Sequence, residues 1–102
     1  MSDKVVWSGY EFGVYNPDAN WSDVGGLYIF AGLNTRNQWV ALYIGRAKSL
    51  QNRLSNHDNW EAAARRGATH VHARAESQQA TRERIEEVLI RTYQPVLNVQ
   101  LK

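Results

Sequence analysis

The sequence predicts an α/β (α+β) domain in which helices flank a small, mostly antiparallel sheet of three strands. Two short apolar runs that carry tyrosines, at 26–31 and 40–45, are joined by a turn-rich segment at 34–37, which is typical of a β-hairpin. A later apolar run at 69–75 is the third strand. Between and after these runs the apolar residues follow a helical period. The expected order is β-β-α-α-β-α.

Length and composition fit one small globular domain. The 102 residues are 43% hydrophobic and include four tryptophans, five tyrosines and no cysteine. A chain of this length buries a core of its own, and the lack of cysteine excludes disulfides and cysteine–zinc sites. The first residues lack the basic and apolar segments of a signal peptide, and no apolar stretch reaches membrane-spanning length. We therefore expect a soluble, cytoplasmic protein with no membrane partner.

Residues 1–24 form an aromatic and acidic N-terminal arm that precedes the main domain at 25–102. The arm holds five aromatic residues: Trp7, Tyr10, Phe12, Tyr15 and Trp21. We expect it to pack as an ordered part of a single compact domain. Within it, the run at 5–7 is a candidate for an extra edge strand because Val and Trp favour strands.

Alternation along the two central strands assigns their faces. In the first strand Tyr28 and Phe30 share one face, and in the second Tyr43 shares its face with Ala41 and Gly45. The positions expected to face the core are Leu27, Ile29, Leu42 and Ile44.

Three helices are expected after the hairpin. Ser49 is the N-cap of a helix whose Leu50 and Leu54 point inward. Asp58, with Glu61 three residues later, is typical of a capping box for a second helix that Gly67 would end. The helix at 81–93 has the clearest apolar period, and a proline follows it at position 95.

Helical geometry separates two adjacent glutamates in this last helix. Glu86 lies beside the apolar stripe, and Glu87, about 100° further round, points to solvent. A carboxylate at the edge of an apolar face must be paired, protonated or bound to a metal. Two interpretations stay open for Glu86, a salt bridge to Arg82 four residues earlier and a metal site.

The middle of the chain is basic. Residues 31–74 contain seven arginines and lysines against two acidic residues, whereas residues 1–30 contain one basic and four acidic residues. Guanidinium groups match phosphate oxygens, so this distribution suits a phosphate-bearing partner or an ordinary solvated surface. Arg53 and His57, spaced i, i+4, form either a surface pair or a pair that holds a phosphate and handles a proton.

Two further polar features have less specific interpretations. His70 and His72 share one strand face. With no further His or Cys beside them, we favour a pair that faces solvent or nucleic acid over a metal site. Asn98, which follows the proline, is either a surface amide or a late structural tie.

In order and spacing these residues resemble the GIY-YIG endonuclease family. Gly26-Leu27-Tyr28 matches its first motif, with Leu in place of the usual Ile, and Tyr43-Ile44-Gly45 matches its second. The stretch at 46–54 is similar to the one that follows this motif in the nuclease domain of the bacterial excision-repair incision subunit. Arg53, Glu86 and Asn98 complete the pattern, and the resemblance covers residues 25–99.

The resemblance implies a metal-dependent endonuclease, a hydrolase that cuts phosphodiester bonds in DNA. Glu86 would bind one Mg²⁺ or Mn²⁺ ion, and Tyr28, with Tyr43 adjacent, would activate water with help from Lys48 or His57. Arg53 would hold the phosphate and Asn98 would brace the site. The other expected substrate-binding residues are Arg46, Lys48, Arg65 and Arg66.

The main alternative is a nucleic-acid-binding module with the same fold and no catalysis, because the basic middle suits both functions. A domain of this size offers a limited interface for specific recognition. We therefore expect nicking with weak sequence or structure preference, or specificity supplied by a homodimer or a protein partner.

Overall fold

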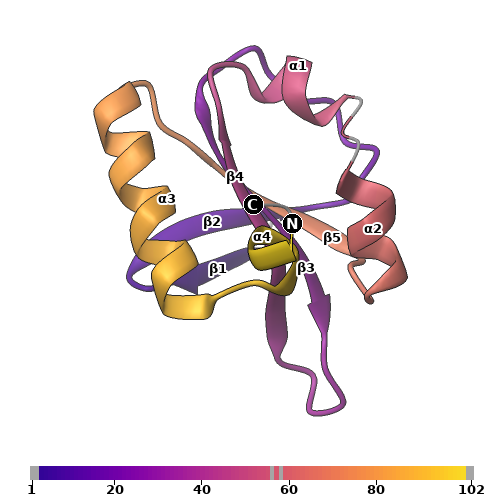
Figure 1. Ribbon diagram of the computed structural model, residues 1–102. Coiled ribbons are helices and arrows are strands. Elements are labelled where there is room, and N and C mark those ends of the chain that lie inside the picture. The colour runs from indigo at the N-terminus through magenta and orange to yellow at the C-terminus, as the bar shows by residue number, and fades with distance from the viewer. Residues whose placement is uncertain (1–2, 56, 58, 101–102) are drawn as a thin grey trace.

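The computed structural model describes residues 3–55, 57 and 59–100, without the side chains of residues 99 and 100 (Figure 1). Its strands are β1 (Lys4–Trp7), β2 (Tyr10–Tyr15), β3 (Gly26–Leu33), β4 (Trp39–Ala47) and β5 (His70–Ala75). Its helices are α1 (Leu50–Leu54), α2 (Asn59–Arg65), α3 (Gln79–Tyr93) and α4 (Val96–Gln100). The expected capping residue Asp58 lies outside the described residues.

The sheet has five antiparallel strands in the order β1-β2-β5-β3-β4, so the prediction of three strands is wrong. The three central strands and the helices between them follow the predicted order. The additional strands come from the N-terminal arm, where Ser8 and Gly9 both have positive φ angles. A two-residue turn of this kind matches the twist of a hairpin. The arm therefore folds into β1 and β2, and β2 pairs with β5.

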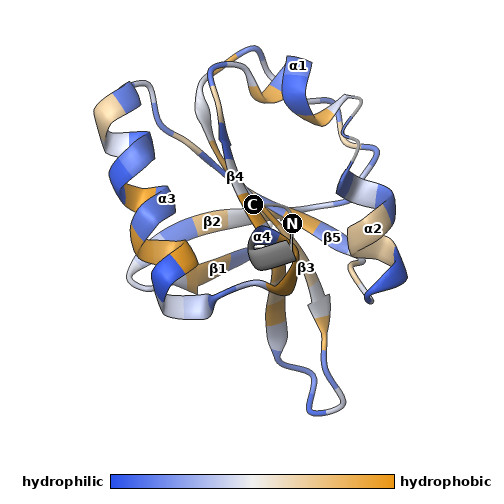
Figure 2. Cartoon of the chain, in the orientation of Figure 1, coloured by the Kyte–Doolittle hydropathy of each residue, from blue (hydrophilic) through white to orange (hydrophobic). Residues whose placement is uncertain are grey.

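Helices cover both faces of the sheet and bury two separate apolar clusters. On one face, Ile85 and Leu89 of α3 pack with Leu27 and Ile29, and α3 alternates between hydrophobic and hydrophilic residues along its length (Figure 2). On the other face, α1, α2 and α4 cover Tyr28 and Phe30. The tyrosine-bearing face is thus a second core. No helix in the described part of the chain is long and apolar enough to cross a membrane.

A β-bulge in β4 corrects the predicted strand faces. Phe30 pairs with Tyr43, and the next residue, Ala31, pairs with Ala41, so Leu42 has no opposite residue on β3. The extra residue shifts the alternation by one. As a result Ala41 joins the α3-side cluster, whereas Tyr43 lies on the other side with Tyr28. The prediction that Ala41 and Tyr43 share a face is wrong for this reason.

His72 is fully buried, which overturns its interpretation as a side chain that faces solvent or nucleic acid. Trp7 donates its indole N–H to His72 Nδ1 at 3.0 Å, so the neutral ring carries its proton on Nε2. Nε2 has no hydrogen-bond partner among the described residues. Burial, with a smaller contribution from His70, lowers the pKa of His72 from 6.5 to about 4.

We expect acid to destabilise this fold through His72. The unfolded chain protonates this histidine near pH 6.5 and the folded chain only near pH 4. Stability should fall as the pH drops through this window, by about 3 kcal/mol in total. Urea unfolding at several pH values measures the slope. His72→Gln, which keeps an acceptor for Trp7, should flatten it. An equal slope in wild type and variant would contradict this assignment.

Candidate active site

The Tyr28 hydroxyl is the meeting point of three elements. Tyr28 lies on β3, Arg53 on α1, and His57 follows α1. His57 Nε2 is 2.7 Å from the Tyr28 oxygen, and Arg53 donates its Nε–H to the same oxygen at 3.3 Å. Ser49 caps α1 by accepting the backbone N–H of Asn52, as predicted, and so sets the start of the helix that carries Arg53.

The backbone next to His57 determines what His57 gives to Tyr28. The backbone N–H of Asn59 donates to His57 Nδ1 at 3.0 Å. The neutral imidazole therefore carries its proton on Nε2 and donates to the Tyr28 oxygen. Both neighbours are donors, which is the environment that a negatively charged phenolate requires.

Burial opposes ionisation of Tyr28, which is only 1% exposed. Burial raises the pKa of its hydroxyl, the hydrogen bond from Arg53 lowers it, and nearby Tyr43 raises it further. Burial prevails, so the pKa of Tyr28 stands well above that of an ordinary tyrosine. The same hydrogen bond raises the pKa of Arg53, which keeps its charge. Tyr43 is half-buried, and its ring centroid lies 6.2 Å from that of Tyr28.

Gly45 makes room for the Tyr28 ring. The two residues are directly opposite on β3 and β4. A Cβ added at Gly45 would collide with the Tyr28 hydroxyl and the adjacent ring carbon. The glycine of the second motif is therefore needed to hold the tyrosine of the first.

Gly45→Ala should displace the Tyr28 ring and destabilise the protein by about 1–3 kcal/mol, the usual cost of overpacking. Tyr28→Phe removes the oxygen that the new methyl group would strike, although it keeps the adjacent ring carbon, so it relieves the collision in part. Gly45→Ala should therefore cost less in the Tyr28→Phe background than in wild type. A double-mutant cycle by chemical denaturation measures this coupling. Additive effects would mean that the collision is relieved elsewhere.

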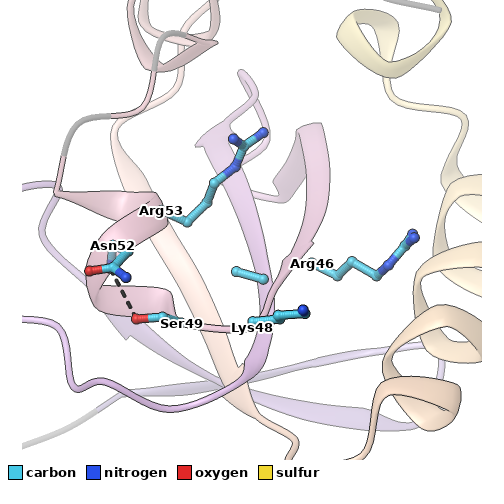
Figure 3. A pocket seen from close by; sticks show the side chains of 6 residues that line it. Arg46, Lys48, Ser49, Asn52 and Arg53 are labelled. Atoms are coloured by element: carbon cyan, nitrogen blue, oxygen red, sulfur yellow. Dashed lines mark hydrogen bonds between the residues drawn. The ribbon is translucent and has the colours of Figure 1, made fainter.

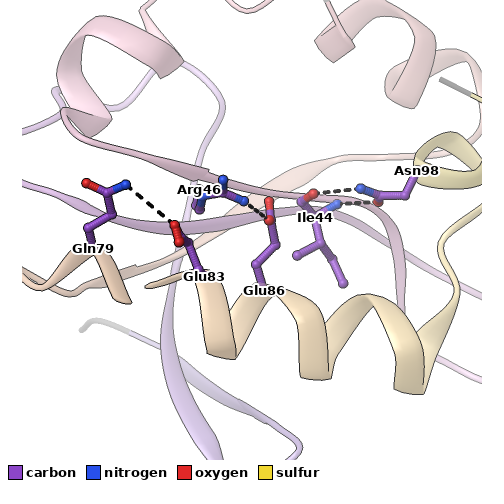
Figure 4. Close-up of polar contacts among 6 residues, drawn as sticks. All are labelled: Ile44, Arg46, Gln79, Glu83, Glu86 and Asn98. Carbon is purple, nitrogen blue, oxygen red and sulfur yellow. Dashed lines mark hydrogen bonds and ion pairs between the residues drawn. The ribbon is translucent and has the colours of Figure 1, made fainter. Parts of the chain in front are cut away.

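Glu86 and Glu87 point to opposite sides of α3, as the helical period predicts. The Glu86 side chain is 17% exposed and pairs with Arg46 of β4 (Figure 4). The Glu87 side chain is 67% exposed and pairs with Arg91. The salt bridge to Arg82 is absent. Arg82 is buried and donates to the backbone carbonyls of Glu76 and Ser77. Sequence spacing did not identify Arg46 as the partner of Glu86, because the two residues are forty positions apart and meet only in the folded chain.

Asn98 ties α4 to the edge strand β4. Its Nδ2 donates to the carbonyl of Ile44, and its Oδ1 accepts the Ile44 backbone N–H, both at 2.8 Å (Figure 4). The amide thus hydrogen-bonds the backbone as a further strand would, between Tyr43 and Gly45. Of the two interpretations of Asn98, the structural tie matches this geometry.

A basic pocket of about 440 Å³ opens beside the Arg53–Tyr28 hydrogen bond and the Arg46–Glu86 ion pair. Its side chains come from the end of β4 and the start of α1 (Figure 3). They are Arg46, Ala47, Lys48, Ser49, Asn52 and Arg53. Arg46 links the pocket to Glu86, and Arg53 links it to Tyr28. Ser49 and Asn52 also line the pocket, although no sequence pattern marked either of them as a binding residue.

Arg65 and Arg66 do not line this pocket. They lie at the end of α2, where Thr69 donates its backbone N–H to Ala31 near the far end of β3. The pocket is at the opposite end of that strand, beside Gly26, whose pairing partner is Ala47. The five residue-to-residue steps from Gly26 to Ala31 span about 16 Å of strand. These arginines are therefore well separated from Arg46 and Lys48.

Among the solved structures that resemble this chain are two of a nuclease domain. Both are of the GIY-YIG N-terminal endonuclease domain of UvrC from Thermotoga maritima, as point mutants in which a tyrosine is replaced by phenylalanine, and both are bound to the catalytic divalent cation. The TM-score is 0.58 in each case, the identities are 26% and 25%, and the matches cover 74% of this chain and 82% of the other. No family model and no curated protein matches the chain. The structural likeness confirms the resemblance to the GIY-YIG nuclease domain.

Proposed function

We propose that this chain is a divalent-metal-dependent endonuclease of the GIY-YIG type that hydrolyses phosphodiester bonds in DNA. The observation that carries the proposal is the convergence of Arg53 and His57 on the Tyr28 hydroxyl, next to a basic pocket. A buried tyrosine bonded to two donors, beside cations that suit a phosphate, fits hydrolysis better than passive binding. The catalytic divalent cation of the similar UvrC domains supports the same reaction class.

The residues around Glu86 fit a single Mg²⁺ or Mn²⁺ ion. The described residues contain no cluster of three or more His, Cys, Asp or Glu side chains. Glu86 would be the carboxylate ligand, because its side chain lies against the pocket residue Arg46. Mg²⁺ is commonly held by one or two carboxylates, with waters and substrate phosphate oxygens as its other ligands. When bound, the ion would supply Lewis-acid stabilisation of charge on the phosphate and the leaving oxygen.

The chain's own residues would position the phosphate and move the proton. Lys48 and Arg46 attract the sugar–phosphate backbone of DNA to the basic pocket. Arg53 offers its two terminal nitrogens to the phosphate while its Nε contacts Tyr28. The Tyr28 phenolate oxygen would accept from Arg53 and His57 and keep a third lone pair for the attacking water. Tyr28 in its phenolate form would then take the proton of the attacking water, with His57 Nε2–H holding the oxygen in place. Asn98 fixes the strand that carries Tyr43.

A supercoiled plasmid assay tests the proposal. With Mg²⁺ or Mn²⁺ the protein should convert supercoiled plasmid to nicked circle, and EDTA should stop the reaction. One site per chain cuts one strand at a time, so linear product should lag behind nicked product if the protein is a monomer. Branched DNA and RNA substrates tested in parallel would define the preferred nucleic acid.

The alternative function, a non-catalytic binding module of the same fold, makes a different prediction in this assay. It would bind DNA with the salt dependence of phosphate contacts and leave the plasmid intact in both metals. Salt-dependent binding without any cleavage would overturn the nuclease proposal. Cleavage that persists in EDTA would overturn its metal dependence.

A further inference from the structure

A second, smaller cleft lies on the tyrosine-bearing face of the sheet, against the other side of α1. Its volume is about 190 Å³. One wall is the aromatic pair Tyr15, at the end of β2, and Trp21, in the segment that leads to β3. Leu50 of α1 and Ala73 and Ala75 of β5 also line the cleft.

The aromatic wall is held in place. The Tyr15 ring folds back over Gly13, where an added Cβ would lie 2.7 Å from its hydroxyl. The Tyr15 and Trp21 rings meet at 66° with their centroids 5.1 Å apart. Trp21 packs against the cluster beneath it, whereas Tyr15 remains 41% exposed. The cleft therefore offers a rigid aromatic surface that a ligand can reach.

The segment that contains Trp21 is hydrogen-bonded to α1, the helix that contributes Asn52 and Arg53 to the basic pocket. The backbone N–H groups of Leu50 and Gln51 donate to the carbonyls of Val24 and Ser22, at 2.8 and 3.1 Å. These are first-turn donors, which have no partner within their own helix. Leu50 in the cleft and Arg53 in the phosphate pocket are three residues apart on α1, about 4.5 Å along its axis. The cleft and the pocket are thus adjacent subsites with a fixed spacing.

The chemistry of the cleft suits a flat aromatic ring rather than a charged group. Asn20 and Ser22 add an amide and a hydroxyl to the aromatic wall. Arg74 also borders the cleft, but its Nη1 donates to the Glu11 carbonyl and its guanidinium lies over the Tyr10 ring, while its buried Nε has no hydrogen-bond partner among the described residues. The volume is below the roughly 300–1,000 Å³ of sites for drug-sized ligands. Nucleobases stack on aromatic side chains with little dependence on sequence.

We propose that the Tyr15–Trp21 cleft is a stacking subsite for one unpaired nucleobase of the strand whose phosphate binds beside Arg53. The identity of that strand rests on the proposed function. A base in a duplex is stacked on its neighbours and cannot enter the cleft. The subsite therefore directs the domain to nucleic acid with unpaired nucleotides at or beside the cut, such as flaps, branches and single strands, over a continuous duplex.

Paired substitutions separate stacking from structural packing. Trp21→Leu and Tyr15→Leu keep apolar bulk and remove the aromatic ring, whereas Trp21→Phe and Tyr15→Phe keep a ring. Affinity is measured in EDTA with a single-stranded oligonucleotide that carries the fluorescent base 2-aminopurine, with a flapped duplex and with a continuous duplex. The leucine variants should lose about 5- to 150-fold in affinity for the first two ligands, and much less for the continuous duplex. The phenylalanine variants should bind nearly as wild type.

Stacking should also quench 2-aminopurine emission in wild type at one or two positions of the oligonucleotide. Equal losses on all three ligands, or full affinity in the leucine variants, would overturn the subsite. Thermal unfolding identifies a leucine variant that fails to fold. If Trp21→Leu fails to fold, the comparison of Tyr15→Leu with Tyr15→Phe decides the question, because Tyr15 is exposed. If the wild-type protein nicks plasmid and the leucine variants keep full affinity for the nucleic acids, only the cleft proposal is rejected. Position-specific quenching without any nicking would reject only the nuclease.

Discussion

Glu86→Gln is expected to reduce metal-dependent cleavage to the background of the assay, while Glu87→Gln stays close to wild type. The two residues are adjacent, yet only Glu86 faces the pocket side of α3, where it pairs with Arg46. Glutamine keeps the size of the side chain and an oxygen that accepts from Arg46, but it removes the negative charge that a divalent cation requires. The comparison therefore isolates the charge at one position of one helix turn.

Plasmid nicking in Mg²⁺ and Mn²⁺ measures this effect, and binding of Mn²⁺ to each variant gives a readout that does not depend on turnover. Both variants should unfold as cooperatively as wild type, because neither carboxylate is part of a buried cluster. Equal losses of activity in the two variants would show that Glu86 has no special role. Unchanged Mn²⁺ binding in Glu86→Gln would move the metal to another site.

Tyr28→Phe is expected to lower turnover by roughly 10²–10⁴-fold, the usual worth of a positioned proton acceptor. The ring and its packing remain, so DNA and metal binding should survive. Tyr43→Phe is the matched control, because its ring stands beside Tyr28 on the same face. If Tyr43→Phe fails and Tyr28→Phe cuts normally, the roles of the two tyrosines are exchanged. If both cut normally, neither tyrosine activates the water.

The pH dependence of the wild-type cleavage rate tests the same role of Tyr28 as the proton acceptor. Only the phenolate accepts a proton from water, and burial raises the pKa of Tyr28 above its ordinary value. The phenolate fraction at neutral pH is therefore small and grows tenfold with each pH unit. Single-turnover rates should rise through the alkaline range without levelling off near pH 10, as far as the protein stays folded. The residual activity of Tyr28→Phe should lack this rise.

Local sequence patterns predicted the central hairpin, β5 and the three helices that follow the hairpin. The helical period separated Glu86 from Glu87, and Ser49 marked the start of α1. The candidate edge strand at 5–7 is confirmed as β1, at the edge of the sheet. Its partner β2 was missed because the Ser8-Gly9 turn is short and Gly13 interrupts the apolar alternation of β2. The bulge at Leu42 could not be predicted, because nothing in a strand sequence marks an unpaired residue.

Contacts between distant residues were harder to predict than elements. The order and spacing of Tyr28, Arg53 and Glu86 suggested one site, and the fold brings Tyr28 and Arg53 into contact. The His57 tautomer depends on the backbone of Asn59, and the partner of Glu86 depends on how α3 packs against β4. His72 was misplaced for a related reason. A histidine on a strand has the same sequence pattern whether its face meets solvent or other side chains, and His72 is buried between Trp7 of the added strand β1 and Trp39 of β4.

The ion pair between Arg46 and Glu86 couples the two ligands of the proposed reaction. Arg46 occupies the Glu86 carboxylate in the free protein and also lines the phosphate pocket. A phosphodiester that draws the guanidinium away leaves the carboxylate open to a cation, and a cation on the carboxylate releases the guanidinium to the phosphodiester. By thermodynamic linkage each ligand must then tighten the binding of the other by the same factor. Titrations of Mn²⁺ with and without DNA would show no such cooperativity if Arg46 stayed on Glu86 throughout. If the titrations show this cooperativity, the domain would hold the proposed cation weakly until nucleic acid binds.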